Sequence, residues 1–175
     1  CVFTMGLPVL GICYGMQTMA SQLGGKVDTS DVREFGYAQV KVEGHSALIG
    51  EVKDHTGTAG EALLDVWMSH GDRIEVLPPG FKSMAYTENS PLAVMCNEEG
   101  TYFGIQFHPE VVHTPQGAEI LKNFVFGVCK AEGDWTPANF VTDAIDRIKT
   151  RVGDGKVICA LSGGVDSMVV AALIH

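Results

Sequence analysis

The sequence has no apolar run long enough to cross a membrane and no charged leader followed by an apolar segment. It has no cluster of lysine or arginine, and its net charge of −9 argues against a nucleic-acid-binding surface. Its 5 cysteines include no C-x-x-C pair, so a disulfide framework is not expected. No pattern of residues predicts a metal site. These absences together favour a globular protein of the cytoplasm, without membrane or nucleic-acid partners.

The chain is long enough for one domain and part of a second, with 175 residues. It begins at Cys1 rather than at a methionine and ends inside the apolar segment 169–175. We therefore interpret it as a fragment that is truncated at both ends. The polar, glycine-containing stretch 131–138 is the best candidate linker, between a first domain over 1–130 and a second over 139–175.

The strongest local pattern lies in residues 8–25. An apolar run at 9–12 predicts a short buried strand, and apolar residues at 16, 19, 20 and 23 predict one face of a helix. Gly24 and Gly25 supply the signal that ends this helix.

Cys13 lies at the corner between that strand and that helix. It is flanked by Gly11 and Gly15, as the serine is in the G-x-S-x-G nucleophile elbow. A thiol at a helix N-terminus is expected to favour the thiolate, and the Tyr14 N–H can receive the oxyanion of an acyl intermediate. The alternative is a buried structural cysteine in a glycine-rich turn.

The middle of the chain is rich in short strands, which we expect at 39–42, 63–68, 74–77, 83–86, 93–96 and 102–107. Residues 27–33 are interpreted as a polar connection and residues 50–62 as a surface loop. The polar cluster Ser69-His70-Gly71-Asp72 follows the 63–68 strand. At a strand end it is either a ligand site or a simple turn.

His108 and Glu110 follow the last of these strands, and residues i and i+2 of a strand share one face. The pattern predicts an imidazole oriented by a carboxylate, as in a catalytic triad. A solvated His-Pro turn is the alternative. Thr114-Pro115 then predicts the N-cap and first position of a helix that ends near Cys129.

The last third combines a helix, a strand and a loop. Apolar residues at 141, 145, 148 and 152 predict an amphipathic helix, and the run 156–161 is typical of a strand in a parallel sheet. The loop 162–167 reads Ser-Gly-Gly-Val-Asp-Ser and leads into a helix from about Met168. Its glycines let backbone N–H groups point toward an anion, although it is not the G-x-x-x-x-G-K-[ST] loop of kinases and GTPases.

Three of these motifs carry a family resemblance. Gly11-Ile12-Cys13-Tyr14-Gly15-Met16-Gln17 and Gly104-Ile105-Gln106-Phe107-His108-Pro109-Glu110 resemble the two signatures of class I glutamine amidotransferases. The loop 162–167 resembles the PP-loop of ATP pyrophosphatases. The two amidotransferase signatures followed by this loop, in this order, resemble the arrangement of the glutamine-hydrolysing GMP synthases. The implied fold is α/β, with a mixed sheet flanked by helices and then the first strand, loop and helix of a PP-loop domain.

The resemblance also implies roles for individual residues. Cys13 is the nucleophile, His108 its base and Glu110 the residue that orients His108. Tyr14 contributes the oxyanion N–H, and the glutamine pocket includes Gln17, Ser69, His70, Gly71 and Asp72. ATP is bound, with Mg²⁺, by Ser162, Gly163, Gly164, Val165, Asp166, Ser167 and Met168.

The implied reaction aminates XMP to GMP with ammonia from glutamine, while ATP is converted to AMP and pyrophosphate. The second oxyanion donor is expected upstream of residue 1, and the XMP-binding and homodimer-forming elements beyond residue 175. Three alternatives remain: another glutamine-dependent PP-loop synthetase, a free-standing Cys-His-Glu hydrolase, and a silent regulatory subunit that binds glutamine or a nucleotide.

Overall fold

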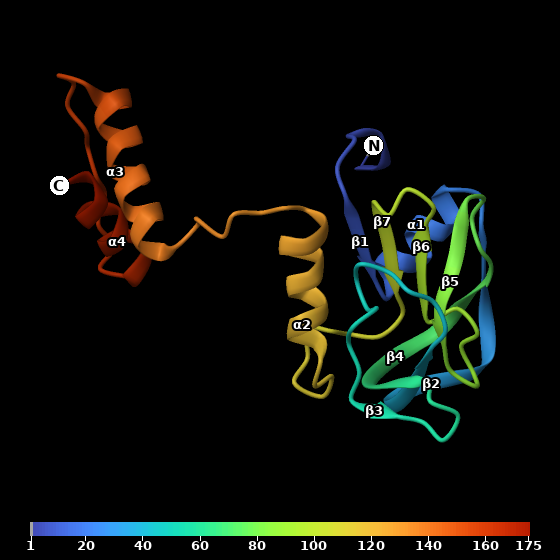
Figure 1. Cartoon of the computed structure of the whole chain (residues 1–175). Coiled ribbons are helices and arrows are strands. Elements are labelled where there is room, and N and C mark those ends of the chain that lie inside the picture. The colour runs from blue at the N-terminus through green and yellow to red at the C-terminus, as the bar shows by residue number, and fades with distance from the viewer. Residues whose placement is uncertain (1) are drawn as a thin grey trace. The chain divides into compact units, whose positions relative to one another are not determined.

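The computed structural model describes residues 2–175, apart from the side chains of residues 30–32, so Cys1 lies outside the described residues. The chain forms two compact units, Cys1–Ala131 and Glu132–His175. The first unit contains η1 (Val2–Thr4), β1 (Val9–Ile12), α1 (Tyr14–Gln22), β2 (Lys26–Val42), β3 (His55–Thr56), β4 (Ala62–Val76), β5 (Phe81–Tyr86), β6 (Val94–Asn97), β7 (Tyr102–Ile105), α2 (Gly117–Lys122) and the π-helix η2 (Asn123–Val128) (Figure 1). The second contains α3 (Pro137–Val152) and α4 (Val165–Ile174).

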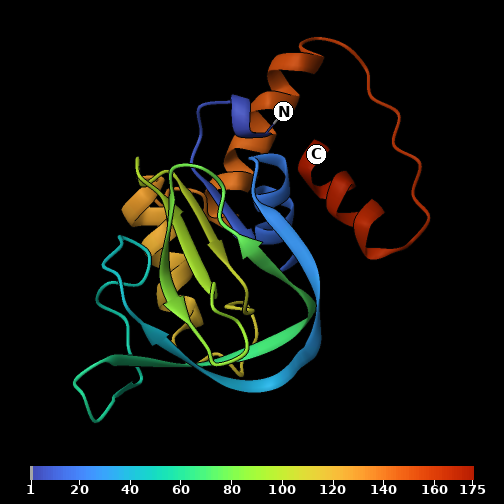
Figure 2. The ribbon, with the colours of Figure 1, turned by 90° about the vertical axis from the view of Figure 1, so that its right-hand side faces the viewer.

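The seven strands form one mixed sheet in the order β1-β7-β6-β5-β2-β4-β3. β1 pairs with β7 in parallel, and the other pairs are antiparallel. The expected α/β class and mixed sheet are therefore confirmed. β2 and β4 form a long, strongly curved pair (Figure 2).

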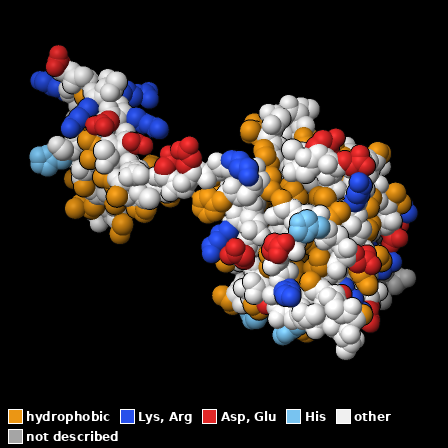
Figure 3. All heavy atoms as spheres, viewed as in Figure 1, with side chains coloured by type: hydrophobic (Ala, Val, Ile, Leu, Met, Phe, Trp, Pro, Cys, Tyr) orange, Lys and Arg blue, Asp and Glu red, His pale blue; other side chains and the backbone are white. Residues whose placement is uncertain are grey.

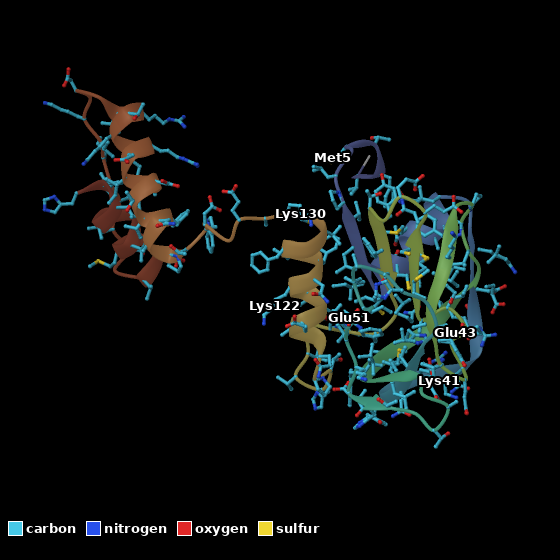
Figure 4. All side chains as sticks on the ribbon, viewed as in Figure 1. Met5, Lys41, Glu43, Glu51, Lys122 and Lys130 are labelled. Atoms are coloured by element: carbon cyan, nitrogen blue, oxygen red, sulfur yellow. The ribbon has the colours of Figure 1, made fainter. Side chains whose placement is uncertain are left out.

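Helices cover both faces of the sheet (Figures 1 and 2). α1 packs Met16 and Met19 against Met95 of β6, whereas Ile120 of α2 packs into the cluster that contains Phe103 and Ile105 of β7. Successive residues of a strand point to opposite faces, so these short central strands can be apolar on both sides. Lys122 projects from α2 away from the sheet, and its ammonium lies 3.3 Å from Glu119 (Figure 4).

The expected strand and helix around Cys13 are confirmed. Met16, Met19 and Ala20 are fully buried, as the helical spacing of apolar residues predicts. The helix ends where Gly24 adopts a φ of 94°, and the Gly25 N–H donates to the Ala20 carbonyl at 2.8 Å. A left-handed glycine closing the last turn is a common helix stop.

Two expectations about β2 and β4 are wrong. Residues 27–33 belong to β2 rather than to a connection, and residues 69–72 lie inside β4 rather than after its end. The two strands pair from Lys26↔Val76 to Val42↔Ala62, with register shifts between Thr29 and Glu34. Each strand supplies the backbone partners of the other, so pairing overrides the polar composition of both segments.

The hairpin of β6 and β7 is confirmed by the pairs Val94↔Ile105 and Cys96↔Phe103. β7 ends at Ile105, two residues earlier than expected, because the next N–H groups bind outside the ladder. Gln106 N–H donates to the Ala93 carbonyl at 2.8 Å, and His108 N–H donates to the Trp67 carbonyl of β4 at 3.0 Å.

The unit Glu132–His175 contains the expected amphipathic helix, α3. Thr136 is its N-cap and accepts a hydrogen bond from the Asn139 N–H at 3.1 Å. The expected strand at 156–161 is wrong: no described residue pairs with this segment, and Ile158 is 97% exposed. A parallel strand needs a neighbour for its backbone groups. Exposed apolar side chains are visible on this unit (Figure 3). None of the described helices is long and apolar enough to span a bilayer.

The helix that follows His108 begins at Gly117, and Thr114 is not its N-cap. The buried Thr114 hydroxyl instead accepts a hydrogen bond from the Trp67 N–H at 3.1 Å and donates to the His108 carbonyl at 2.6 Å. Because His108 N–H also binds the Trp67 carbonyl, one side chain completes a backbone pair between β4 and the segment after β7. Thr114 thereby fixes the main chain of His108.

We expect Thr114→Val to destabilise the fold by about 1–3 kcal/mol, because two partly buried backbone groups lose their partner. Thr114→Ser keeps the hydroxyl and is the matched control, which should lose clearly less. Urea unfolding of the three proteins measures the difference. Equal loss in both variants would show that the methyl group, not the hydroxyl, matters at this position.

Candidate active site

Cys13 occupies a strained corner between β1 and α1. Its φ of 49° and ψ of −106° are unusual for a residue other than glycine. The Cys13 N–H donates to the Ile105 carbonyl of β7 at 2.7 Å, and its carbonyl accepts from the Gln17 N–H at 3.2 Å. These two bonds extend the sheet and begin the helix, so they hold the corner.

The two glycines of the elbow differ in what they permit. A β-carbon on Gly11 would lie 2.7 Å from backbone atoms of Gly15 and Met16, so only glycine fits there. A β-carbon on Gly15 would meet nothing within 4 Å. Close packing of strand and helix therefore requires Gly11, while Gly15 faces open space.

The Cys13 thiol is partly buried and makes two weak contacts. It donates to the Ser69 carbonyl at 3.6 Å and accepts from the Gln106 side-chain amide at 3.6 Å. Burial raises the pKa of Cys13, and the Tyr14 N–H and the Gln106 amide lower it only in part. The negative charge of Glu110 adds to the rise. The Tyr14 N–H at the helix N-terminus favours the thiolate as expected, but burial outweighs it, so deprotonation calls for a base.

His108 and Glu110 lie in the turn after β7 rather than on the strand itself. His108 Nδ1 is 2.6 Å from Glu110 Oε1. A carboxylate accepts, so Nδ1 carries the proton of the neutral ring and Nε2 is left free to act as a base. The expected orientation of an imidazole by a carboxylate is present, formed by a turn and not by strand alternation.

The parallel pairing of β1 and β7 brings Cys13 to the segment that carries His108. Ile12 is opposite Ile105, and Gln106 touches the sulfur. Glu110 is near enough for its charge to act on Cys13. Among the described residues no hydrogen bond joins Cys13 to His108 directly, although the pairing of β1 with β7 brings both to the same edge of the sheet.

The residues expected in the glutamine pocket fall into two groups. Gln17 and Asp72 line a cleft of about 270 Å³ together with Tyr14. Ser69 contributes its carbonyl to the thiol contact, and Gly71 lies against the side chain of Arg33.

The side chain of His70 is buried away from the thiol, between Glu34 Oε2 at 3.1 Å and the Asp72 carbonyl at 3.0 Å. Burial tends to raise the pKa of Glu34, but hydrogen bonds from His70 and Thr87 prevail and lower it. His70 therefore supports the shape of β4 through a buried pair with β2.

A larger cleft, of about 420 Å³, lies over β2 and the turn at 87–89. None of its described lining residues is a cysteine or a histidine, so this cleft lacks the two residue types expected at the active site. Within the described part of the chain, no three His, Cys, Asp or Glu side chains are placed to hold a metal ion.

Two residues of the site were missed by sequence reasoning. Gln106 is fully buried and contacts the sulfur, and Thr114 holds the backbone of His108. A glutamine inside an apolar strand was the one available signal for Gln106. The position of Thr114, just before Pro115 and the expected helix, predicted only a helix N-cap.

The residues expected to bind ATP, Ser162 to Met168, lie in the loop 162–164 and the first turn of α4. Ser162 Oγ accepts from the Gly164 N–H at 3.3 Å and lies 3.2 Å from Ser167 Oγ. Gly163 has a φ of 84°, which favours glycine, whereas Gly164 has an ordinary φ of −80°. The helix begins at Val165, three residues before the expected start, so Val165, Asp166, Ser167 and Met168 form its first turn.

Comparison with known proteins gives a consistent result. GMP synthases (glutamine-hydrolysing) of Alkalilimnicola ehrlichii and Methylococcus capsulatus are each 59% identical to this chain over 174 residues, which is 99% of the chain and 33% of those proteins. The chain thus spans about a third of the length of these relatives. A crystal structure from Thermoplasma acidophilum, of a protein described as one subunit of a GMP synthase, matches with a TM-score of 0.66 at 30% identity, over 74% of this chain and 60% of that one.

The model of one protein family, "Glutamine amidotransferase class-I", matches residues 2–128. This range includes the Cys13 corner, the whole mixed sheet and the His108–Glu110 turn. The chain belongs to the class I glutamine amidotransferase family.

Proposed function

We propose that this chain is part of a glutamine-hydrolysing GMP synthase and that residues 1–131 are its glutaminase. The observation that carries the proposal is the strained Cys13 corner joined through β7 to a histidine oriented by a carboxylate. The identity of 57–59% to GMP synthases over nearly the whole chain supports the choice of this enzyme within the family.

In the proposed reaction the sulfur of Cys13 attacks the side-chain amide carbon of glutamine. His108 Nε2 takes the thiol proton and returns it to the departing nitrogen, so ammonia leaves and a γ-glutamyl thioester remains. The Tyr14 N–H receives the oxyanion. Water, deprotonated by His108, then attacks the thioester, which yields glutamate and restores the thiol. Glu110 holds the imidazole in the required tautomer.

The glutamine substrate is proposed to lie in the cleft lined by Gln17, Asp72 and Tyr14, the residue that follows Cys13. The remaining members of the Ser69–Asp72 cluster shape this cleft through the backbone of β4. This position fits a small polar substrate, because carbonyl and amide groups line the approach.

We propose that Ser162 to Met168 bind the pyrophosphate portion of ATP. The free N–H groups of the first turn of α4 suit an anion, and the left-handed Gly163 lets the loop curl around one. Mg²⁺ would accompany ATP, where it neutralises phosphate charge; Asp166 is the acidic residue of the loop. Ammonia then replaces oxygen at C2 of adenylylated XMP, with release of AMP.

We also propose a homodimer and a cytoplasmic location for the complete enzyme. The four described cysteines are unpaired, which supports a reducing compartment.

Cys13 can be tested as the nucleophile in the complete enzyme. A diazo-ketone analogue of glutamine should label the Cys13 peptide in preference to all other cysteine peptides. Cys13→Ala should lower glutamine-dependent synthesis at least about a thousandfold but keep synthesis from ammonium salt. Cys129→Ala, at an exposed cysteine, is the control and should behave as wild type. Label concentrated elsewhere would refute the assignment.

The loop is tested by Gly164→Ala. A β-carbon there meets only Ser162 Oγ, at 3.5 Å, so the unliganded loop accepts it without strain. Crowding of the phosphates should nevertheless lower AMP formation about a hundredfold with either nitrogen source. Gly127→Ala, at an exposed helical glycine with open space, is the matched control. Normal release of AMP and pyrophosphate by Gly164→Ala would exclude this loop as the ATP site.

A further inference from the structure

A chain of buried amides ends on the Cys13 sulfur. Gln17 Nε2 donates to the Asp72 carbonyl at 2.8 Å and to Gln106 Oε1 at 3.3 Å. Gln106 Nε2 lies 3.6 Å from Cys13 Sγ. Gln106 is fully buried and Gln17 is 7% exposed, so water does not compete freely for these bonds.

The direction of every bond in this chain follows from one backbone carbonyl. The Asp72 carbonyl can only accept, so Gln17 must turn its nitrogen, and not its oxygen, toward it. The second hydrogen of that nitrogen is directed at Gln106, which must present its oxygen. The nitrogen of Gln106 is therefore the group that faces the sulfur. His70 Nδ1 also lies 3.0 Å from the Asp72 carbonyl, which anchors the far end of the chain.

We propose that Gln106 is a catalytic residue that donates a hydrogen bond to the Cys13 thiolate, and that Gln17 is a positioning residue that keeps the Gln106 amide turned toward the sulfur. This inference rests on the proposed role of Cys13 as nucleophile. Gln106 is the one side chain, among those described, that donates to the sulfur. The other donor is the backbone N–H of Tyr14.

The need for this donor follows from the surroundings of the thiol. The Ser69 carbonyl accepts from the protonated thiol, and this contact is lost when the proton leaves. Burial and the charge of Glu110 also oppose the thiolate. In the proposed reaction His108 receives the proton. The Gln106 amide and the Tyr14 N–H are the groups that oppose these effects. A hydrogen bond to an ionised group is stronger than one to a neutral group, so the contact gains strength as the thiolate forms.

The same geometry limits what Gln17 can do for a substrate. Both of its amide hydrogens are directed at protein acceptors, so only its oxygen remains for a ligand in the adjoining cleft. Gln17 thus acts on the reaction through Gln106, and any direct contact with glutamine would be made as an acceptor.

The test measures alkylation of Cys13 by iodoacetamide as a function of pH, in the complete enzyme and without glutamine, by mass spectrometry of the Cys13 peptide. Gln106→Met keeps the length of the side chain and removes the donor. We expect the inflection of the alkylation–pH curve of this variant to lie about one to two pH units above that of wild type. Its kcat for glutamine hydrolysis should fall about tenfold or more. Gln39→Met, on an exposed glutamine of β2, is the matched control and should leave both unchanged.

Gln106→Glu has the same shape and guards against a packing defect of the methionine variant. Its carboxylate places an acceptor against the sulfur, so its inflection should rise at least as far. Gln17→Met should raise the inflection less than Gln106→Met, and the double variant should not exceed Gln106→Met alone, because Gln17 acts through Gln106.

An unchanged inflection in both Gln106 variants would overturn the proposal for Gln106. Additive shifts in the double variant would overturn the positioning role of Gln17. If Cys13→Ala still hydrolyses glutamine while the Gln106 variants shift the alkylation profile, the proposed function is wrong and the amide–sulfur contact stands.

Discussion

The parallel pairing of β1 and β7 is the constraint on which the candidate site depends. β1 ends at Ile12, opposite Ile105, and the Cys13 N–H continues the pairing by one more bond, of 2.7 Å. This register places Cys13 beside Gln106, which lies two residues before His108 in the sequence. A slip of one residue would turn Gln106 to the other face of the sheet and remove its contact with the sulfur.

β4 supports both halves of the site through its backbone. The Ser69 carbonyl accepts from the Cys13 thiol, and the Trp67 carbonyl accepts from the His108 N–H. Thr114 completes the second contact by joining the Trp67 N–H to the His108 carbonyl. Side chains of the 69–72 cluster matter less than the sequence suggests, because the carbonyls of Ser69 and Asp72 make the contacts that reach the site.

The parts of this arrangement that sequence reasoning predicted are local. The apolar residues of β1 and α1 and the glycines around Cys13 specify a strand, a corner and a helix within twenty residues. The length of β2, the position of Ser69–Asp72 inside β4 and the bridging hydroxyl of Thr114 could not be predicted, since each depends on a partner strand far away in the sequence. The segment 156–161 shows the reverse case, because its apolar composition suits a strand but no described neighbour pairs with it.

The surroundings of the Cys13 sulfur favour the protonated thiol. The Ser69 carbonyl stabilises the thiol, whereas the Tyr14 N–H and the Gln106 amide stabilise the thiolate. Burial shifts the balance toward the thiol and raises the pKa of Cys13. In the proposed reaction, transfer of the thiol proton to His108 removes the Ser69 contact and strengthens the other two. In the proposed reaction the Cys13 sulfur is therefore activated by transfer of its proton to His108, and not by the helix N-terminus alone. In the proposed mechanism, the orientation of His108 by Glu110 and Thr114 and the orientation of Gln106 by Gln17 therefore act on the same step.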